Sequence, residues 1–161
     1  MQLFLNQKFC SNLSPHALAA YCALRMLTLK ERPMVCVSVD ILCYHLFGNF
    51  GYSKHTPEYV REGLKEILDN KIVQQIDGKK NYYVLDCSSL LLPGSQEKFT
   101  IVTDQEVNKV FSIKGINNYI LLKYFIALIG SFSSKTSITV GEKTKHRVVG
   151  NSAISYISKI T

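Results

Sequence analysis

The chain has 161 residues, of which 47% are hydrophobic and 19% charged, and this composition excludes a largely disordered protein. Its net charge of +7 favours an acidic partner, but the charge is unevenly distributed. Residues 1–106 carry 11 of the 19 bases and 11 of the 12 acids, so the whole excess lies in residues 107–161. The basic character therefore belongs mainly to the last third of the chain.

The pattern of cysteines and apolar stretches predicts a cytoplasmic protein without membrane contact. Five cysteines form an odd number without a C-x-x-C pair, which indicates free thiols in a reducing compartment. No basic segment followed by an apolar run opens the sequence, so no secretory signal is predicted. The longest apolar stretch, Tyr119–Phe132, contains Lys123 and is shorter than the ~20 residues of a spanning helix. It is interpreted as a core helix.

The first predicted elements are a helix, a short strand and a second helix. Ser14 and Pro15 are typical of an N-cap and first helical position, and the helix is expected to run to about Leu29. Met34–Ser38 is a β-prone run, and Val39–Phe47 fits a helix that is capped by Ser38 and closed by the glycine-rich turn after it.

The most distinct helix signal covers residues 56–68. Thr56 is expected as its N-cap and Pro57 as its first residue, while Val60, Leu64 and Ile67 form an apolar stripe. Two β-prone segments follow, 72–76 and 81–85, joined by residues 77–80 with Gly78 expected at positive φ. The order helix, strand, helix, helix, hairpin predicts a winged helix over residues 13–86, within a domain of residues 1–90.

The remaining sequence partly repeats this order. Residues 91–102 are predicted to be a linker because of Pro93-Gly94-Ser95. Thr103–Phe111 is a helix with a capping box to Glu106, and Asn117 or Asn118 caps a long helix through Phe132. A strand at 146–149 and a helix at 151–160 would follow. In this repeat, residues 118–132 would correspond to residues 15–29, and residues 152–161 to residues 39–47. The predicted fold class is α+β, mainly helical, with a tandem winged helix whose second copy, residues 103–161, is incomplete.

A winged helix inserts one helix into the major groove of DNA, and here that helix is residues 56–68. Its N-terminal end is expected to meet a phosphate through unpaired backbone N–H groups, and Arg61 and Lys65 are the candidates for base contact. The predicted hairpin would form the wing, and Lys79 and Lys80 at its tip would lie along the DNA backbone. The candidate DNA-binding residues here are Ser53, Lys54, His55, Thr56, Arg61, Lys65, Lys79 and Lys80.

Two alternatives remain open for these charges. Glu58, Glu62, Glu66 and Asp69 interleave with Arg61 and Lys65, so pairing within the helix would also account for them. The basic C-terminal part is a second candidate site for nucleic acid, since release of counterions from phosphates would supply affinity there. Its predicted contact residues are Lys143, Lys145 and Arg147.

No other chemistry emerges from the sequence. The histidines have no metal-ligand spacing, and the glycine-rich stretches lack the lysine and serine of a phosphate loop. Neither a nucleophile nor a catalytic base is recognisable, so no enzymatic activity, metal or cofactor is predicted.

Residues 13–25 (LSPHALAAYCALR), 56–67 (TPEYVREGLKEI) and 71–73 (KIV) resemble the N-terminal winged helix of replication initiation proteins from Gram-positive plasmids, integrative elements and phages. DnaD-like primosomal proteins share this layout. The resemblance implies a duplex-DNA-binding replication initiator, often with two winged helices in tandem. It also implies self-association and contact with a helicase or helicase loader. The turn at residues 48–55 is longer than in the usual pattern.

Three hypotheses follow. The first is sequence-specific duplex binding in replication initiation. The second is an interaction module in which the N-terminal winged helix self-associates and the basic C-terminal part binds nucleic acid. The third, a transcriptional regulator on the same fold, is not separable from the first by sequence.

Overall fold

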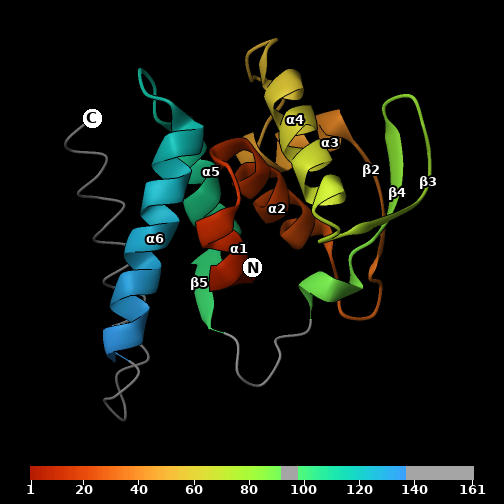
Figure 1. The fold of residues 1–161 in the computed structure, drawn as a ribbon. Helices are drawn as coiled ribbons and strands as arrows, with labels where there is room; N and C mark the ends of the chain where they lie inside the picture. The colour runs from red at the N-terminus through yellow and green to blue at the C-terminus, as the bar shows by residue number, and fades with distance from the viewer. Residues whose placement is uncertain (92–97, 137–161) are drawn as a thin grey trace.

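The computed structural model describes residues 1–91 and 98–136, which form an α+β fold that is mainly helical. They contain two antiparallel sheets, one of β1 and β5 and one in the order β2–β4–β3 (Figure 1). The elements are β1 (Gln2–Asn6), α1 (Gln7–Asn12), α2 (Pro15–Leu27), β2 (Met34–Ser38), α3 (Val39–Phe47), α4 (Thr56–Asp69), β3 (Gln74–Lys79), β4 (Tyr82–Asp86), a 3-10 turn (Ser88–Leu90), β5 (Phe99–Thr103), α5 (Asp104–Ser112) and α6 (Asn118–Thr136).

The predicted α2, β2 and α3 are confirmed, with their caps. The Ser14 hydroxyl accepts the N–H of Ala17 at 3.2 Å, and the Ser38 hydroxyl accepts that of Ile41 at 3.3 Å. α2 ends two residues before its predicted end at Leu29. The reason is a tight turn, since the Thr28 hydroxyl donates to the Leu24 carbonyl at 2.6 Å and Leu29 already bridges to Arg32.

The hairpin is also confirmed, but its turn lies further along the chain than predicted. The strands are residues 74–79 and 82–86, so Lys80 and Asn81 make the turn. Asn81, not Gly78, takes the positive φ, at 68°. Asparagine tolerates this left-handed conformation, whereas Gly78 is needed for space: a Cβ there would lie 2.9 Å from the carbonyl oxygen of Tyr82.

The sequence did not predict β1, α1 or β5. Leu3 and Leu5 are buried and alternate with exposed residues in β1, and the buried Thr100 and Val102 alternate with half-buried residues in β5. The two strands pair antiparallel, from Gln2 opposite Thr103 to Asn6 opposite Phe99. β5 therefore occupies the end of the segment that was expected to be a linker.

The two helices predicted after this segment are confirmed. Thr103 and Glu106 form the expected capping box of α5, and the Asn117 side chain accepts the N–H groups of Tyr119 and Ile120 at the start of α6. The predicted strand at 146–149 and helix at 151–160 lie outside the described residues.

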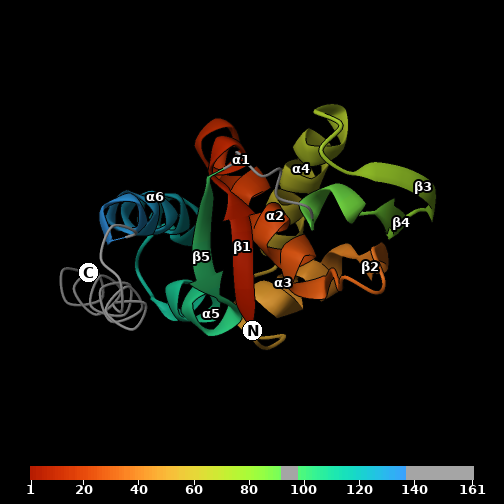
Figure 2. The same ribbon diagram turned by 90° about the horizontal axis from the view of Figure 1, so that it is seen from below.

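Both halves of the described chain begin in the same order. A strand is followed at once by a short helix and then by a long one, as β1–α1–α2 and as β5–α5–α6. Figure 2 shows the paired strands β1 and β5 in the middle, with α5 and α6 on one side and α2 on the other. The predicted correspondence between Pro15–Leu29 and Asn118–Phe132 therefore extends to the strand and the short helix that precede each of them.

One hydrophobic core joins these parts. α2 lies at its centre and packs against α3, α4, α6 and β1, and nine of its 13 residues are buried. Core residues come from both sides of the expected linker, including Leu18 of α2 and Phe125 of α6. None of the helices described is long and apolar enough to cross a membrane.

Candidate nucleic-acid interface

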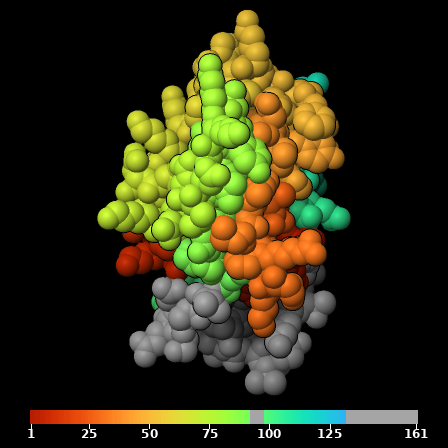
Figure 3. Space-filling view, turned by 90° about the vertical axis from the view of Figure 1, so that its right-hand side faces the viewer, coloured from red at the N-terminus to blue at the C-terminus, as the bar shows by residue number. Residues whose placement is uncertain are grey.

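Three segments share one face of the molecule: the loop of residues 48–55, α4 and the tip of the β3–β4 hairpin. Figure 3 shows this face, with the loop at the top, α4 on the left and the hairpin in the centre. Seven of the predicted contact residues here are exposed and one is buried; the exposed ones are Ser53, Lys54, His55, Arg61, Lys65, Lys79 and Lys80. We name this surface the α4–hairpin face.

α4 is held by its apolar stripe and by a glycine. Val60, Leu64 and Ile67 are each at most 1% exposed and face the core. Gly63 lies between them, where a Cβ would stand 2.2 Å from the carbonyl oxygen of His16 at the start of α2. Only glycine allows this approach, so α4 crosses α2 with the two backbones in direct contact.

Two acids of α4 turn toward α2. The Glu66 carboxylate accepts the N–H of Ser14 at 3.1 Å and also the Ser14 hydroxyl, so it lies at the N-terminal end of α2, where the helix dipole favours a negative charge. Glu62 lies 3.4 Å from the imidazole of His16. Both carboxylates thus have partners on α2 rather than on α4 itself.

The bases of α4 are left without these acids. Among the described residues, no ion pair joins Arg61 or Lys65 to any acid of α4, so the intrahelical pairing that sequence allows is not observed. The Arg61 guanidinium instead donates to the Asn81 side-chain oxygen at 3.3 Å. This bond ties α4 to the hairpin turn beside Lys79 and Lys80.

One predicted DNA-contact residue, Thr56, is wrong. It is 4% exposed and its side chain lies against the hydroxyl of Tyr119, a residue of α6 whose pKa burial raises to about 12. Thr56 is already helical, and His55 holds the cap position without a side-chain cap bond. The Ser53 hydroxyl closes the start of the helix by accepting the His55 N–H at 3.2 Å. Thr56 is therefore a packing residue, unable to face a ligand.

The start of α4 also lacks the expected free N–H groups. The Thr56 N–H donates to the Ser53 carbonyl at 3.0 Å, and the Glu58 N–H donates to the His55 carbonyl at 3.1 Å. Pro57 has no N–H to offer. An anion at this end would therefore be bound by side chains such as Lys54 rather than by the backbone.

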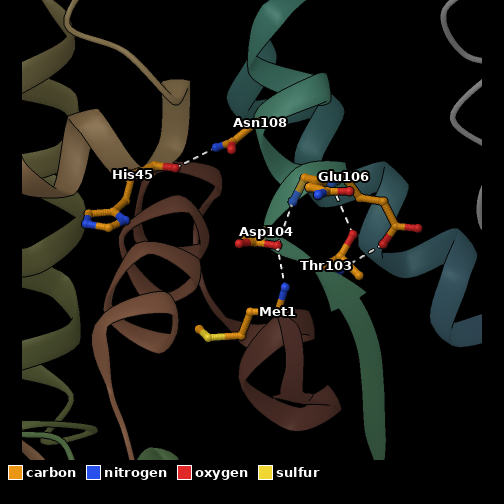
Figure 4. A network of polar contacts seen from close by, with 7 residues as sticks. Met1, His45, Thr103, Asp104, Glu106 and Asn108 are labelled. Atoms are coloured by element: carbon orange, nitrogen blue, oxygen red, sulfur yellow. Dashed lines mark hydrogen bonds and ion pairs between the residues drawn. The ribbon is translucent and has the colours of Figure 1, made fainter.

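The second half of the chain holds the loop that leads into α4. The Asn108 amide of α5 donates to the carbonyls of His45 and Leu46 at 2.6 and 2.8 Å, at the C-terminal end of α3 (Figure 4). Gly48 then ends α3 with φ 73°. The Tyr52 hydroxyl donates to Asp40 at 3.2 Å, which fixes the far end of the loop to the first turn of α3.

A network at the start of α5 keeps this contact in place. The N-terminal ammonium of Met1 lies 2.9 Å from the Asp104 carboxylate (Figure 4). Burial raises the pKa of Asp104, but hydrogen bonds from this ammonium and from the Gln105 N–H outweigh it, and the pKa is lowered. Burial lowers the pKa of the neighbouring His45.

Sequence reasoning missed two residues of this surface. Phe50, at the tip of the loop, is 70% exposed and stacks on Tyr44 with ring centroids 4.6 Å apart. A phenylalanine between two glycines was the signal for an exposed tip. Asn81 was assigned to a strand, although asparagine after two lysines is itself a turn signal.

The other site predictions have different outcomes. Lys143, Lys145 and Arg147 lie outside the described residues. All five cysteines are free, and burial raises the pKa of Cys10 and Cys43 to about 12. Where the chain is described, no group of three or more His, Cys, Asp or Glu side chains lies close enough to hold a metal ion.

In comparisons with known proteins, no family model matches the chain, and no curated protein or solved structure matches it either.

Proposed function

We propose that residues 13–86 form a winged helix that binds duplex DNA through the α4–hairpin face. The order α2, β2, α3, α4 and β3–β4 hairpin, with β2 on the outer side of β4, supports this assignment. α4 would enter the major groove and the hairpin would act as the wing along the phosphate backbone. A helix of 14 residues with one fully exposed side suits the groove.

The separation of charges on α4 is the observation that carries the proposal. Glu62 and Glu66 have partners at the start of α2, while Arg61 and Lys65 remain exposed without an acid partner among the described residues, and Arg61 contacts the hairpin turn. Residues 1–106 are neutral as a whole, but Lys54, Arg61, Lys65 and the two hairpin lysines are all exposed on the α4–hairpin face, with Glu58 and Asp69 as the further exposed acids of α4. Such a cluster favours phosphates.

The biological role follows from the family resemblance and belongs to the proposal. We infer a replication initiator or primosomal factor of a mobile element, acting in the cytoplasm, where the free thiols would stay reduced. The shared order β1–α1–α2 and β5–α5–α6 supports a tandem arrangement, with residues 103–161 as part of a second winged helix. A transcriptional regulator would use the same face.

The proposal is tested by selecting a duplex from a randomised pool and measuring its affinity for variants. Arg61→Ala and Lys65→Ala are each expected to cost about 1–3 kcal/mol of specific binding. Lys79→Ala should weaken binding to all sequences and reduce the slope of log K against log salt by about one.

Lys109→Ala is the matched control, because Lys109 is an exposed lysine on α5, outside the three segments that form the α4–hairpin face. It removes the same charge and should leave the affinity within the range of screened long-range effects. Unchanged affinity in both Arg61→Ala and Lys65→Ala, or an equal loss in Lys109→Ala, contradicts the proposal. Circular dichroism checks that each variant is folded.

A further inference from the structure

The three-stranded sheet has two edges that differ in their protection. β3 forms one edge, and it carries Asp77, Lys79 and a shift of register between Gln75 and Asp77. Charges and bulges of this kind prevent an edge strand from pairing with another chain. β2 forms the other edge, with the sequence MVCVS, no charge and a regular register against β4. Within the described residues, β4 is its one sheet partner.

The pairing of β2 with β4 determines which backbone N–H and C=O groups of β2 point away from the sheet. The Cys87 N–H donates to the Pro33 carbonyl at 2.9 Å, so residue 33 belongs to the pairs that face β4. Hydrogen-bonded and non-bonded positions alternate in an antiparallel ladder, which directs the N–H and C=O groups of Met34 and Cys36 and the N–H of Ser38 to the free edge. The Ser38 carbonyl belongs to the first turn of α3, because Ser38 is the N-cap of that helix. Pro33 lacks its N–H on the inner side and therefore does not protect this edge.

The exposed face beside this edge carries apolar side chains, with the acid Asp86 of β4 opposite Met34. Met34 is 46% exposed and Tyr82, on the neighbouring strand, is 44% exposed. Cys36 lies between them in an exposed position. In Figure 3 the surface of β2, in orange, lies beside the hairpin on the same open side of the molecule.

We propose that β2 pairs antiparallel with β2 of a second copy of this chain, with the two-fold axis at Cys36, to form a continuous six-stranded sheet. This register pairs all three outward residues, because Met34 then lies opposite Ser38 of the other copy and Cys36 opposite Cys36. An axis at any other residue of the strand would pair fewer of them.

Charges at the ends of the strand complement each other in this register. Within residues 34–38, residues whose numbers sum to 72 stand opposite each other, so Arg32 lies beyond the strand on the side of the partner's α3, whose first turn contains Asp40. Arg32 and Asp40 are both exposed, and the two-fold axis brings an Arg32 toward the Asp40 of the other copy at both ends. An uncharged strand with opposite charges at its two ends fits a second copy of itself better than an acidic or basic partner.

The pairing leaves the proposed DNA surface free. β2 and β3 are opposite edges of the sheet, so a second copy at β2 extends the sheet away from β3. The dimer does not rest on the proposed function, and either can fail without the other. If both hold, the two α4–hairpin faces are related by a two-fold axis and the bound site is expected to be an inverted repeat.

The test combines sedimentation with cross-linking of the full chain. Sedimentation velocity should give a concentration-dependent monomer–dimer equilibrium. Opposite Cα atoms of a bonded pair lie about 5.5 Å apart, within disulfide range. Copper-phenanthroline should therefore oxidise the two Cys36 thiols to one intermolecular disulfide, with the copper complex accepting two electrons and the solvent two protons. Cys36→Ser should abolish this cross-link and keep the dimer in sedimentation.

Cys36→Lys provides the disruptive variant. It places two ammonium groups directly opposite each other at the axis, where like charges destabilise the pairing. Gln74→Lys is its control, since it adds the same charge to an exposed position on the other edge, β3. We expect Cys36→Lys to be monomeric and folded, and Gln74→Lys to remain dimeric. A monomer at every concentration of the unmodified chain, or a dimer that Cys36→Lys does not weaken, would overturn the proposal.

Discussion

α2 and α6, the helices that follow the strand and short helix of each half, begin in the same setting but are covered differently. In the predicted alignment of the two halves, Ile120 corresponds to Ala17. Ala17 is fully buried where Gly63 brings α4 against α2, whereas Ile120 is 44% exposed and Tyr124, one turn later, 71%. Within the described residues, α6 has no equivalent of α4. The difference between the two halves is therefore α4, which covers α2 through the backbone contact at Gly63.

The largest effect is expected when Gly63 in α4 and Gly130 in α6 are each replaced by alanine. Gly63→Ala should destabilise the protein by about 3 kcal/mol, because the new Cβ meets a backbone carbonyl that cannot rotate away. Gly130→Ala in α6 meets the side-chain oxygen of Thr100 at 2.8 Å, which can yield.

The gain in helix propensity, about 1 kcal/mol, should therefore offset most of the cost at Gly130. Urea denaturation of both variants measures the difference. Equal stabilities of the two variants would show that α4 is not seated by backbone contact.

A smaller loss of stability is expected at the contact between the two halves, where Asn108 of α5 bonds to the end of α3. Asn108→Ala removes two hydrogen bonds to the last carbonyls of α3 and is expected to cost about 1–2 kcal/mol in the free energy of unfolding. It should also increase hydrogen exchange in residues 48–55.

Ser112→Ala serves as the comparison, because its exposed hydroxyl bonds only to the carbonyl of Lys109 in its own helix. If Asn108→Ala is no less stable than Ser112→Ala, the loop before α4 does not depend on the second half.

The smallest effect is a pH dependence at the same joint. The pKa of His45 is lowered from 6.5 by burial, so the unfolded chain binds a proton more readily than the folded one. Stability should be fully present above pH 6.5 and fall as the pH drops below it. His45→Gln should flatten this part of the curve, measured by denaturation at several pH values.

A separate loss is expected at lower pH. The pKa of Asp104 is lowered below 3.8, so its contribution is lost only as the pH falls through that lowered value. An identical pH profile for His45→Gln and the unmodified chain would remove His45 from this account.

Much of the fold was predictable because its signals are local. Ser14, Ser38 and the Thr103–Glu106 box mark helix starts within four residues of sequence, and α2, α3 and α5 were found in this way. β1 and β5 were missed because each is five residues long and is stabilised by a partner about a hundred residues away. No local pattern carries that pairing.

The candidate site was predicted in its residue types but not in its arrangement. Thr56 lies against Tyr119, which is 63 residues further along the chain, and the partners of Glu62 and Glu66 lie at the start of α2. Sequence therefore identified Arg61 and Lys65 but left open whether the acids of α4 neutralise them. Gly63 carried no sequence signal, since its role is visible only where two backbones meet.

Chemical-shift mapping with a short duplex tests the central claim most directly. On titration of the isotope-labelled chain at low salt, we expect the amide shifts to concentrate at residues 53–55, the exposed side of α4 and residues 79–81, with Lys109 and its neighbours unchanged. Shifts confined to α5 and α6 or to residues after 136, with α4 and the hairpin unaffected, would contradict the account.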